Sequence, residues 1–333
     1  MTNVLVLGHA DVHASLPPAE CAEAMAEVLA AHARGEAFFP LRTVTIPPDA
    51  AGFMGLMPGW RGAHDGEPAA FALKAICLMP GNPTRGLDAH QGTVTLFDGE
   101  TGVPTAILDA SALTEIRTAA VTAVATRTLA REDAHVLALI GAGVQGRAHL
   151  IALPEVRKFD EIRIYAPTAA HVNALVDAQL DVGGATVVAA ASAEEAVRGS
   201  DVVVVATSSR EPVLIHDWLA PGAHVNAVGA STPTHREIEI ETVAASALFC
   251  DSRESLRNEA GEFRLALELG AIEGEDHIRA ELGEVLAGTA PGRADDGEVT
   301  LFRSLGVAIE DLAAAQHAVA FARRFGIGTE VEL

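Results

Sequence analysis

Between residues 135 and 250, short apolar runs alternate with segments of helical spacing. Strands are predicted at 136–140, 161–165, 186–189, 201–206, 224–228 and 247–250, and helices at 144–153 and 168–180. Ser192-Ala-Glu-Glu is a capping box with Glu195 at its third helical position, so it predicts a further helix start. Near-continuous apolar strands that alternate with helices are typical of a parallel sheet covered on both faces. This part of the chain therefore predicts a doubly wound α/β fold.

The N-terminal region has a different pattern. Ser15-Leu-Pro-Pro-Ala-Glu predicts a helix start, and the apolar residues that follow it share one helical face: Cys21, Met25, Val28 and Leu29. From Leu41 to about Leu108, strand-like runs are separated by Pro, Gly, Asn and Asp. These runs lie at 43–46, 71–79, 93–97 and 104–108. Asp98-Gly-Glu-Thr-Gly predicts a hairpin turn between the last two, so we expect a mainly antiparallel α+β region.

Two further segments predict helices. The Ala-rich run from Ser111 to Ala130 predicts one long helix with Ser111 as its N-cap. The tail from Leu301 to Arg324 is expected to be helical and to return to the N-terminal region. A length of 333 residues exceeds the usual size of one hydrophobic core, so two domains are expected.

Composition excludes several classes of function. A net charge of −22 argues against nucleic acid as a partner, because phosphate binding needs clustered cations. No apolar stretch reaches about 18 residues, so we expect no membrane span, and the uncharged start of the chain predicts no signal peptide. Three widely spaced cysteines suit reduced thiols in the cytoplasm. No spacing of His, Cys and acidic residues suggests a metal site, so no metal is predicted.

The strongest functional motif is Gly141-Ala-Gly-Val-Gln-Gly, which follows an apolar strand and opens a helix with Val144 and Gln145. Gly141 permits the tight turn, Gly143 lets the backbone approach a pyrophosphate, and Gly146 allows close packing of helix on strand. The helix N-terminus then offers free N–H groups to the phosphates. An ordinary glycine-rich turn is the alternative. In this context the motif predicts a dinucleotide site.

The sequence leaves the choice of dinucleotide open. NAD(H) sites usually carry an acid at the end of the second strand, but this chain has Ala166-Pro167-Thr168 there. Without that acid, Thr168 and the helix after it could hold a 2′-phosphate, which favours NADP(H) over NAD(H). Thr207 and Ser208 follow the strand at 201–206 and could line the nicotinamide side, although hydroxyl residues also end strands without any function.

Two cations stand in apolar surroundings. Lys74, one of two lysines in the chain, lies in the apolar run 71–79, and a buried ammonium is costly unless it is paired with an anion. An edge strand with Lys74 facing solvent is the alternative. Arg117 shares a helical face with Leu113 and Val121, although a surface arginine whose stem covers apolar area would give the same pattern.

Arg42 and the polar loop at 86–92 complete the candidate substrate site. This loop contains His90, which is a candidate proton donor or an ordinary loop histidine.

Together these segments resemble the ornithine cyclodeaminase/mu-crystallin family. The motifs that carry the resemblance, in chain order, are Lys74, Pro80-Gly-Asn, Gly86-Leu-Asp-Ala-His-Gln-Gly, Leu96-Phe-Asp-Gly-Glu-Thr-Gly, Thr114-Glu-Ile-Arg-Thr-Ala-Ala, Gly141-Ala-Gly-Val-Gln-Gly, Asn226-Ala-Val-Gly-Ala-Ser and Ser304-Leu-Gly-Val-Ala-Ile-Glu-Asp. The resemblance runs from about residue 15 to 325.

The resemblance implies a homodimer with two domains in each subunit. Residues 1–115 and 305–333 would form the substrate-binding and dimerisation domain, and residues 116–304 the Rossmann domain. The family's carboxylate-binding cations fall on Arg42, Lys74 and Arg117. Arginine offers a planar fork to a carboxylate, whereas lysine is a movable charge and a proton source. The expected cofactor-binding set also includes Val228, Gly229 and Gly306.

The chain departs from the family's cyclodeaminases at Ser231, where those enzymes carry an aspartate. Here the run Gly229-Ala-Ser-Thr-Pro resembles the mu-crystallin and ketimine reductase branch instead. Without that carboxylate, the second ammonium of ornithine would lose its counter-ion in a closed site. The resemblance therefore implies an NAD(P)H-dependent reductase of a cyclic imine or ketimine acid, such as Δ1-pyrroline-2-carboxylate or Δ1-piperideine-2-carboxylate.

In that mechanism Lys74, or His90 through water, would supply the proton. Three alternatives remain: ornithine cyclodeaminase, an amino-acid dehydrogenase such as alanine dehydrogenase, and a non-catalytic cofactor-dependent binding protein. Retention of Lys74 and Arg117 argues against the last, because neither is needed to hold a dinucleotide.

Overall fold

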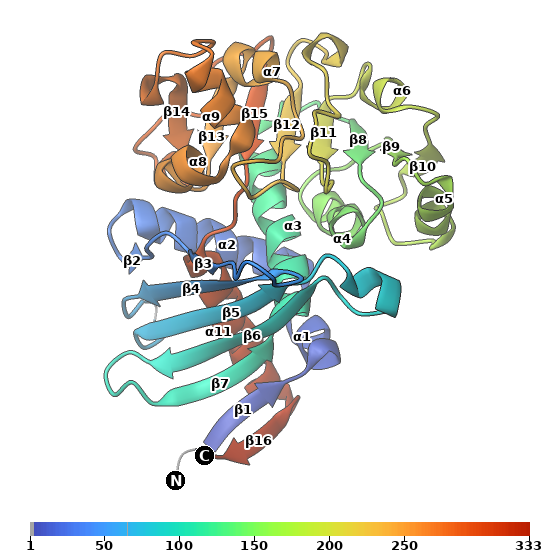
Figure 1. The fold of residues 1–333 in the computed structure, drawn as a ribbon. Helices are drawn as coiled ribbons and strands as arrows, with labels where there is room; N and C mark the ends of the chain where they lie inside the picture. Colours follow the sequence, from blue (N-terminus) through green and yellow to red (C-terminus); the bar gives the residue numbers. More distant parts are fainter. Residues whose placement is uncertain (1–2, 65) are drawn as a thin grey trace. The chain divides into compact units, whose positions relative to one another are not determined.

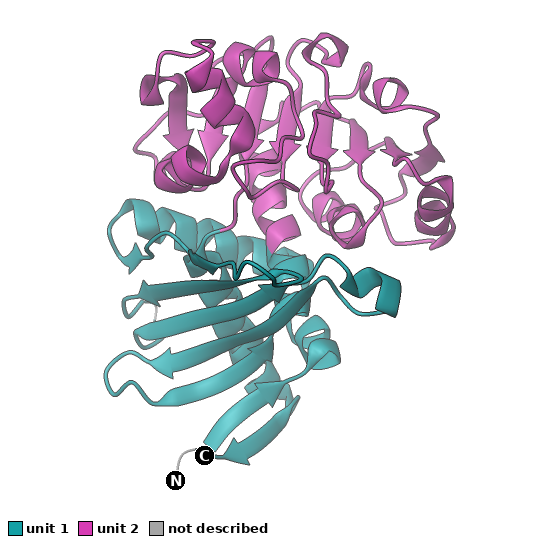
Figure 2. Cartoon of the chain, viewed as in Figure 1, with its two compact units in different colours: residues 1–117, 307–333 teal, residues 118–306 magenta. Residues whose placement is uncertain are grey.

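The computed structural model describes residues 3–64 and 66–333, which form two compact units (Figure 1). Unit 1 comprises residues 1–117 and 307–333, and unit 2 comprises residues 118–306 (Figure 2). The α/β fold class predicted from the sequence is confirmed.

Unit 1 is built on a largely antiparallel sheet of eight strands. Its strands are β1 (Asn3–Leu7), β2 (Ala37–Phe38), β3 (Thr43–Thr45), β4 (Phe53–Arg61), β5 (Ala70–Leu78), β6 (His90–Asp98), β7 (Pro104–Asp109) and β16 (Thr329–Glu332). They follow the order β16-β1-β7-β6-β5-β4-β2, with β3 also paired to β4. Only β1 and β7 run parallel. Four of these strands, β1, β2, β4 and β16, were not predicted; Gly55, Pro58 and Gly59 interrupt the apolar pattern of β4.

Helices cover one face of this sheet. They are α1 (His9–Ser15), α2 (Pro18–Ala33), the first part of α3 (Ala110–Leu129) and α11 (Ala308–Phe325), with a short 3-10 turn at Asn82–Arg85. The last helix, α11, packs against β4, β5, β6 and α2. The apolar face predicted for α2 is confirmed, because Cys21, Met25, Val28 and Leu29 are all buried. Ala70, Ala72, Lys74 and Ile76 of β5 point toward the helices, since alternate strand residues share a face.

Local signals in unit 1 were right about one turn and wrong about one cap. The hairpin at Asp98 is confirmed: its carboxylate accepts hydrogen bonds from the backbone N–H of Glu100 and of Thr101. Asp109, not Ser111, caps α3, because its carboxylate accepts the N–H of Ala112 at 2.8 Å. The Ser111 hydroxyl instead donates to Asp88 at 2.9 Å. The prediction chose the hydroxyl over an acid two residues earlier.

Unit 2 is a parallel sheet of eight strands in the order β10-β9-β8-β11-β12-β15-β13-β14. The strands are β8 (Val136–Ile140), β9 (Glu161–Tyr165), β10 (Thr186–Ala189), β11 (Val202–Val205), β12 (His224–Ala227), β13 (Ala247–Cys250), β14 (Ile278–Glu281) and β15 (Thr300–Arg303). The chain order reverses at β8 and β11, and ligands of such sheets bind outside the carboxyl ends of the strands at this point.

The helices of unit 2 are short. Besides the rest of α3, they are α4 (Val144–Ala152), α5 (Ala169–Asp177), α6 (Ala193–Val197), α7 (Ile240–Ala245), α8 (Arg253–Glu259), α9 (Gly261–Glu268) and α10 (Leu282–Leu286), with 3-10 turns at Leu153–Glu155, His216–Trp218 and Glu275–His277. Two apolar clusters, one centred on Val203 and Val205 and the other on Val202 and Val204, cover the two faces of the sheet.

The prediction of one helix from Leu301 to Arg324 was wrong in its first part. Residues Thr300–Arg303 form the interior strand β15, which is fully buried, and the helix begins at Ala308. The strand contains only two apolar residues, Leu301 and Phe302, and so short a pattern cannot be assigned to helix or strand from periodicity alone.

Among the residues described, no helix combines the length and the apolar character needed to span a membrane. The three cysteines are free thiols, and Cys21 and Cys250 are buried. Over residues 3–64 and 66–333, no group of three or more His, Cys, Asp or Glu side chains is placed to hold a metal.

Candidate functional site

Lys74 is buried on the face of β5 that packs against α11. Its side chain is 3% exposed, and its Nζ donates to Asp311 Oδ1 at 3.1 Å. The neighbouring strands place Met57 and Val94 directly beside it. The solvent-facing alternative for Lys74 is therefore wrong, and the structure supplies the anion that a buried ammonium requires.

Arg117 shares this anion. Its Nε donates to the same Oδ1 of Asp311 at 2.9 Å, and its Nη1 donates to Glu310 Oε2 at 2.8 Å. All four side chains, from β5, α3 and α11, are at most 5% exposed. We call Lys74, Arg117, Glu310 and Asp311 the buried charge cluster. The alternative of a surface arginine at 117 is also wrong.

The cluster changes the protonation of its members. Burial lowers the pKa of Lys74 to about 8, since the attraction of Asp311 only partly offsets lost hydration and the charge of Arg117. Burial alone would raise the pKa of Asp311, but Arg117 and Lys74 outweigh it and hold that pKa below its usual value. At neutral pH Lys74 is therefore charged but close to its titration range, and Asp311 is ionised.

The other two predicted substrate residues lie near the cluster in unit 1. Arg42 precedes β3 and is half-buried, and its charge also lowers the pKa of Lys74. His90 begins β6, and its pKa falls to about 4 through desolvation of the ring and the charges of Lys74 and Arg117. Although the residue as a whole is exposed, at this pKa His90 is neutral at pH 7. The charge of Arg42 thus acts on Lys74, and the charges of Lys74 and Arg117 act on His90, which places the four residues in one neighbourhood of unit 1.

Glu310 and Asp311 were missed as site residues. Both occur in the motif that carried the resemblance, but two acids in the first turn of a helix usually complement its dipole at the surface. A count of buried charges could have identified these two acids from the sequence. Two cations in apolar segments require two anions, and Glu310 and Asp311 are the acids that open the apolar helix α11.

In unit 2 the predicted glycines have distinct local roles. Gly141 has a φ of +119°, and a Cβ added there would lie 2.3 Å from the carbonyl oxygen of Ala206. A Cβ on Gly146 would lie 2.1 Å from the carbonyl oxygen of Gly141. Gly143, which precedes α4, has no atom within 4 Å of an added Cβ. The first two are required by packing, whereas the third leaves its backbone open to a ligand.

A cavity of about 380 Å³ adjoins this loop, between α4 and α5. Gly143 and Val144 line it, and Val144 is 54% exposed. Thr168 is the exposed N-cap of α5, with no side-chain capping bond. An open loop backbone, an apolar contact and a cavity at the carboxyl edge of the sheet fit a dinucleotide.

Glu237, which the sequence reasoning missed, organises the edge beyond β11 and β12. Its Oε1 accepts the backbone N–H of Thr207 at 2.6 Å and the Thr207 hydroxyl at 2.8 Å, and its Oε2 accepts the N–H of Ala230 at 2.8 Å. A Cβ on Gly229 would lie 2.5 Å from Oε1. Burial raises the pKa of Glu237 to about 7 despite Arg303 and these hydrogen bonds. No sequence signal separated Glu237 from its acidic neighbours.

The remaining predicted cofactor residues lie on the same sheet edge. Val228 is buried and Ser208 is exposed. Gly306, with a φ of +75°, follows β15, and its N–H donates to Asp251 Oδ2 at 2.6 Å. The Gln145 side chain is half-buried in the first turn of α4.

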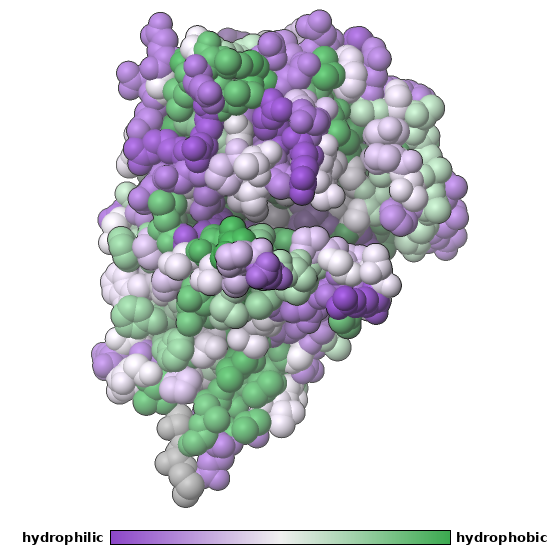
Figure 3. All heavy atoms as spheres, in the orientation of Figure 1, coloured by the Kyte–Doolittle hydropathy of each residue, from purple (hydrophilic) through white to green (hydrophobic). Residues whose placement is uncertain are grey.

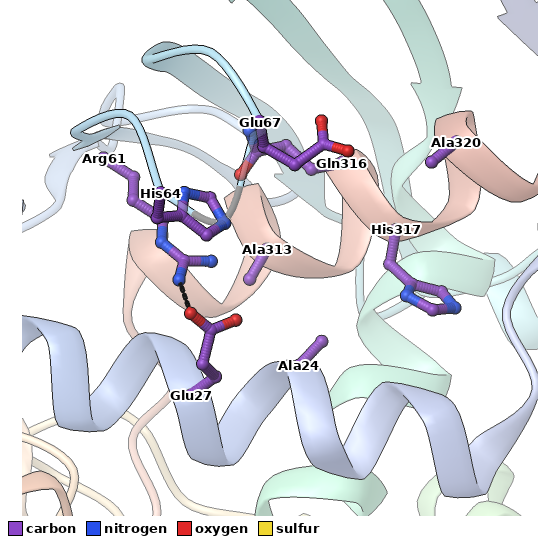
Figure 4. A pocket seen from close by; sticks show the side chains of 9 residues that line it. All are labelled: Ala24, Glu27, Arg61, His64, Glu67, Ala313, Gln316, His317 and Ala320. Carbon is purple, nitrogen blue, oxygen red and sulfur yellow. Dashed lines mark hydrogen bonds and ion pairs between the residues drawn. The ribbon is translucent and has the colours of Figure 1, made fainter. Parts of the chain in front are cut away.

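Unit 1 also has a pocket of about 210 Å³ between α2, the end of β4 and α11 (Figure 4). Arg61 is buried there and forms an ion pair with Glu27. His317, on the α11 side, is paired with Glu20. None of the residues predicted for substrate or cofactor binding lines this pocket, so it is separate from the buried charge cluster.

The ornithine cyclodeaminase/mu-crystallin family model matches residues 2–320. Among curated proteins, the chain is 39% identical over 277 residues to ketimine reductase mu-crystallin of Mus musculus, covering 83% of each protein.

Two solved structures are similar over nearly the whole chain. The first is Δ1-pyrroline-2-carboxylate reductase of Thermococcus litoralis in complex with NADH and L-proline, with a TM-score of 0.93 and 36% identity over 98% of this chain and 100% of that one. The second is an archaeal alanine dehydrogenase dimer with bound NAD, with a TM-score of 0.92 and 31% identity over 100% of both.

These relatives are reductases and dehydrogenases, in agreement with the oxidoreductase class predicted from the sequence. The resemblance seen in the motifs is confirmed, and the chain belongs to the ornithine cyclodeaminase/mu-crystallin family.

Proposed function

We propose that this protein is an NAD(P)H-dependent reductase of a small imine carboxylic acid, of the Δ1-pyrroline-2-carboxylate or Δ1-piperideine-2-carboxylate type. The observation that carries the proposal is the buried charge cluster, which keeps a lysine with a pKa of about 8 beside an arginine. The named activities of the relatives support the same chemistry.

The substrate carboxylate would bind to cations of unit 1. Lys74, Arg117 and Arg42 carry three formal positive charges, and Glu310 and Asp311 carry two negative ones, so these five side chains keep one net positive charge (3 − 2). A monoanionic carboxylate would balance it. Asp311 already binds Lys74 and Arg117, and we propose that these two cations and Arg42 bind the substrate carboxylate together.

Lys74 would supply the proton to the imine nitrogen. A general acid works best when its pKa lies near the working pH, and the pKa of about 8 meets this condition. His90, with a pKa of about 4, is neutral at pH 7 and would serve to orient water rather than to donate a proton.

A reduced nicotinamide cofactor supplies hydride for this chemistry. In unit 2, Gly141, Gly143 and Gly146 with Val144 and Gln145 would hold its pyrophosphate, and Thr168 its adenosine end. Thr207, Ser208, Val228, Gly229 and Gly306 would shape the nicotinamide end. Glu237 and Asp251 bind the backbone there and would keep that edge rigid.

We also propose that the protein is a cytoplasmic homodimer. On the sheet face of unit 1 opposite the helices, Phe38, Met54 and Phe71 are 62%, 43% and 46% exposed. Hydrophobic residues gather over this sheet in Figure 3. An apolar sheet face of this kind suits a second copy of the chain. Sedimentation showing only a 34.5 kDa species would contradict the dimer.

The direct test of the activity mixes purified protein with Δ1-pyrroline-2-carboxylate and NADPH or NADH and follows absorbance at 340 nm. Cofactor oxidation with formation of proline is expected. No oxidation with either cofactor, for this substrate or for Δ1-piperideine-2-carboxylate, would overturn the proposal.

The chain offers a matched control for the proton donor, because it contains only two lysines. Lys74→Met is expected to lower kcat by about 10²-fold or more while dinucleotide binding to unit 2 persists. Lys158→Met, at an exposed position, should leave kcat unchanged. Equal activity of the two variants would remove Lys74 from the mechanism.

A further inference from the structure

The cavity between α4 and α5 contains two basic side chains that the sequence reasoning did not consider. Arg147, on α4, and His171, on α5, both line it. We propose that Arg147, assisted by His171, binds the 2′-phosphate of NADPH and makes this chain prefer NADPH to NADH. This inference rests on the proposed function, because it assigns a role within the same dinucleotide site.

The position of the cavity points to the adenosine ribose. In a fold of this type, the ribose 2′ position lies at the carboxyl end of the second strand, beside the glycine loop. Here that strand is β9, which ends at Tyr165, and α5 begins four residues later. Gly143 and Val144 of the loop line one side of the cavity, and α5 lines the other.

The chemistry of the lining favours an anion. Apart from Arg147 and His171, the residues around the cavity are glycine, alanine, valine and leucine, so none of the acids in the described part of the chain lines it. Ala166-Pro167-Thr168 likewise places no acid at the end of β9. A carboxylate there would bind the 2′-hydroxyl of NADH and repel a 2′-phosphate. The Thr168 hydroxyl, which makes no capping bond, is available as a further donor.

Arg147 is also free to bind a ligand. The chain has 45 acidic residues against 23 lysines and arginines, and other arginines of unit 2 are held by acids, such as Arg131 by Asp201 and Arg253 by Glu284. Over residues 3–64 and 66–333, by contrast, Arg147 makes neither an ion pair nor a side-chain hydrogen bond, and it is exposed. A guanidinium beside a glycine loop, with no acid of its own, suits a phosphate.

The solved relatives described above hold NADH or NAD, so the proposal separates this chain from them. It is tested by binding rather than by turnover. Titration calorimetry measures Kd for NADPH and NADH, and for adenosine 2′,5′-bisphosphate against AMP, which differ only in the 2′-phosphate. The 2′-phosphate should tighten binding about 10- to 100-fold in both pairs, since a charge-assisted hydrogen bond has that strength.

The variants are Arg147→Gln and His171→Gln, with Arg264→Gln as the matched control. Arg264 is an exposed arginine of the same unit on α9. Arg147→Gln should weaken NADPH and adenosine 2′,5′-bisphosphate about tenfold or more and leave NADH and AMP within twofold. His171→Gln should act in the same direction but less, and Arg264→Gln should change nothing.

The outcomes separate the two proposals. If the wild-type protein binds NADPH and NADH equally, or if Arg147→Gln weakens both equally, the 2′-phosphate assignment is overturned and the reductase proposal stands. If neither dinucleotide binds at any accessible concentration, the proposed function itself fails.

Discussion

The two units bury charge for different purposes. In unit 1, the carboxylates of Glu310 and Asp311 hold the cations Arg117 and Lys74. In unit 2, the buried carboxylates of Glu237 and Asp251 hold backbone N–H groups of the loops after β11, β12 and β15. The first arrangement sets the protonation of side chains, and the second sets the course of the backbone. Changes of charge in the buried cluster of unit 1 should therefore have large effects, as should changes of backbone shape in the glycine loop of unit 2.

Removing the charge of Asp311 should have the largest effect on stability. Asp311→Asn keeps the size of the side chain but leaves Lys74 buried without its anion. Losing one partner of a buried ion pair destabilises by about 3–5 kcal/mol, so the free energy of unfolding should fall by about this amount. Urea or thermal unfolding measures it.

Two controls make this prediction specific. Glu330→Gln removes an exposed acid of the same unit and should have an effect within about 0.5 kcal/mol. Adding Lys74→Met to Asp311→Asn removes the ammonium that has lost its anion, so the double variant should recover part of the lost free energy of unfolding. Wild-type stability of Asp311→Asn would mean that Lys74 is not held by this pair.

The second prediction concerns backbone shape in unit 2. Gly141→Ala requires a φ of +119° from a residue with a Cβ and places that atom 2.3 Å from the Ala206 carbonyl oxygen. The expected destabilisation is about 3 kcal/mol, read from thermal unfolding. Gly199 also has a positive φ but open space around it, so Gly199→Ala should cost only about 1 kcal/mol. Equal effects would mean that the close approach to Ala206 is unimportant.

The sequence predicted the strands of unit 2 more accurately than those of unit 1. In unit 2, near-continuous apolar strands and a glycine loop carry their signal locally, so six of the eight strands lay within a residue of their predicted bounds, whereas β14 and β15 were not predicted. In unit 1, the sheet depends on distant pairing, and β1 and β16, which pair with each other from opposite ends of the chain, were not predicted. Asp311 was missed for the same reason, because its partner Lys74 lies 237 residues away.

Site residues were likewise predicted only where the signal lies in their own segment of the chain. Lys74 and Arg117 stood out because each broke an apolar pattern in its own segment. Glu237 did not, since it lies in the polar run Thr234-His-Arg-Glu-Ile-Glu, and only the fold shows which of its acids is buried.

Glu237 gives a pH-dependent test of the unit 2 arrangement. Burial raises its pKa from 4.5 to about 7 in the folded protein, so the folded state binds a proton more tightly than the unfolded state. Stability from this group is full below about pH 4.5 and falls as the pH rises to about 7. The difference of about 2.5 pKa units corresponds to a loss of about 3 kcal/mol as an upper value.

The measurement compares the free energies of unfolding of the wild-type protein and Glu237→Gln between pH 4.5 and 8. The wild-type protein should lose stability relative to the variant up to about pH 7 and then run parallel to it. Parallel curves over the whole range would mean that Glu237 is ionised throughout, as its three hydrogen bonds alone would favour.

Gly143→Ala gives the smallest expected change and the sharpest test of the contrast between the units. The position has a φ of −91° and open space around an added Cβ, so the free energy of unfolding should change by less than about 0.5 kcal/mol. A methyl group there would still obstruct the approach of a pyrophosphate to the backbone, and the Kd of the dinucleotide should rise about tenfold. Gly184→Ala, where space is also open, is the control for binding only, because its φ of +85° makes that substitution cost about 1 kcal/mol of stability. An unchanged Kd in Gly143→Ala would mean that the ligand does not approach this backbone, and the open side of the loop would then need another explanation.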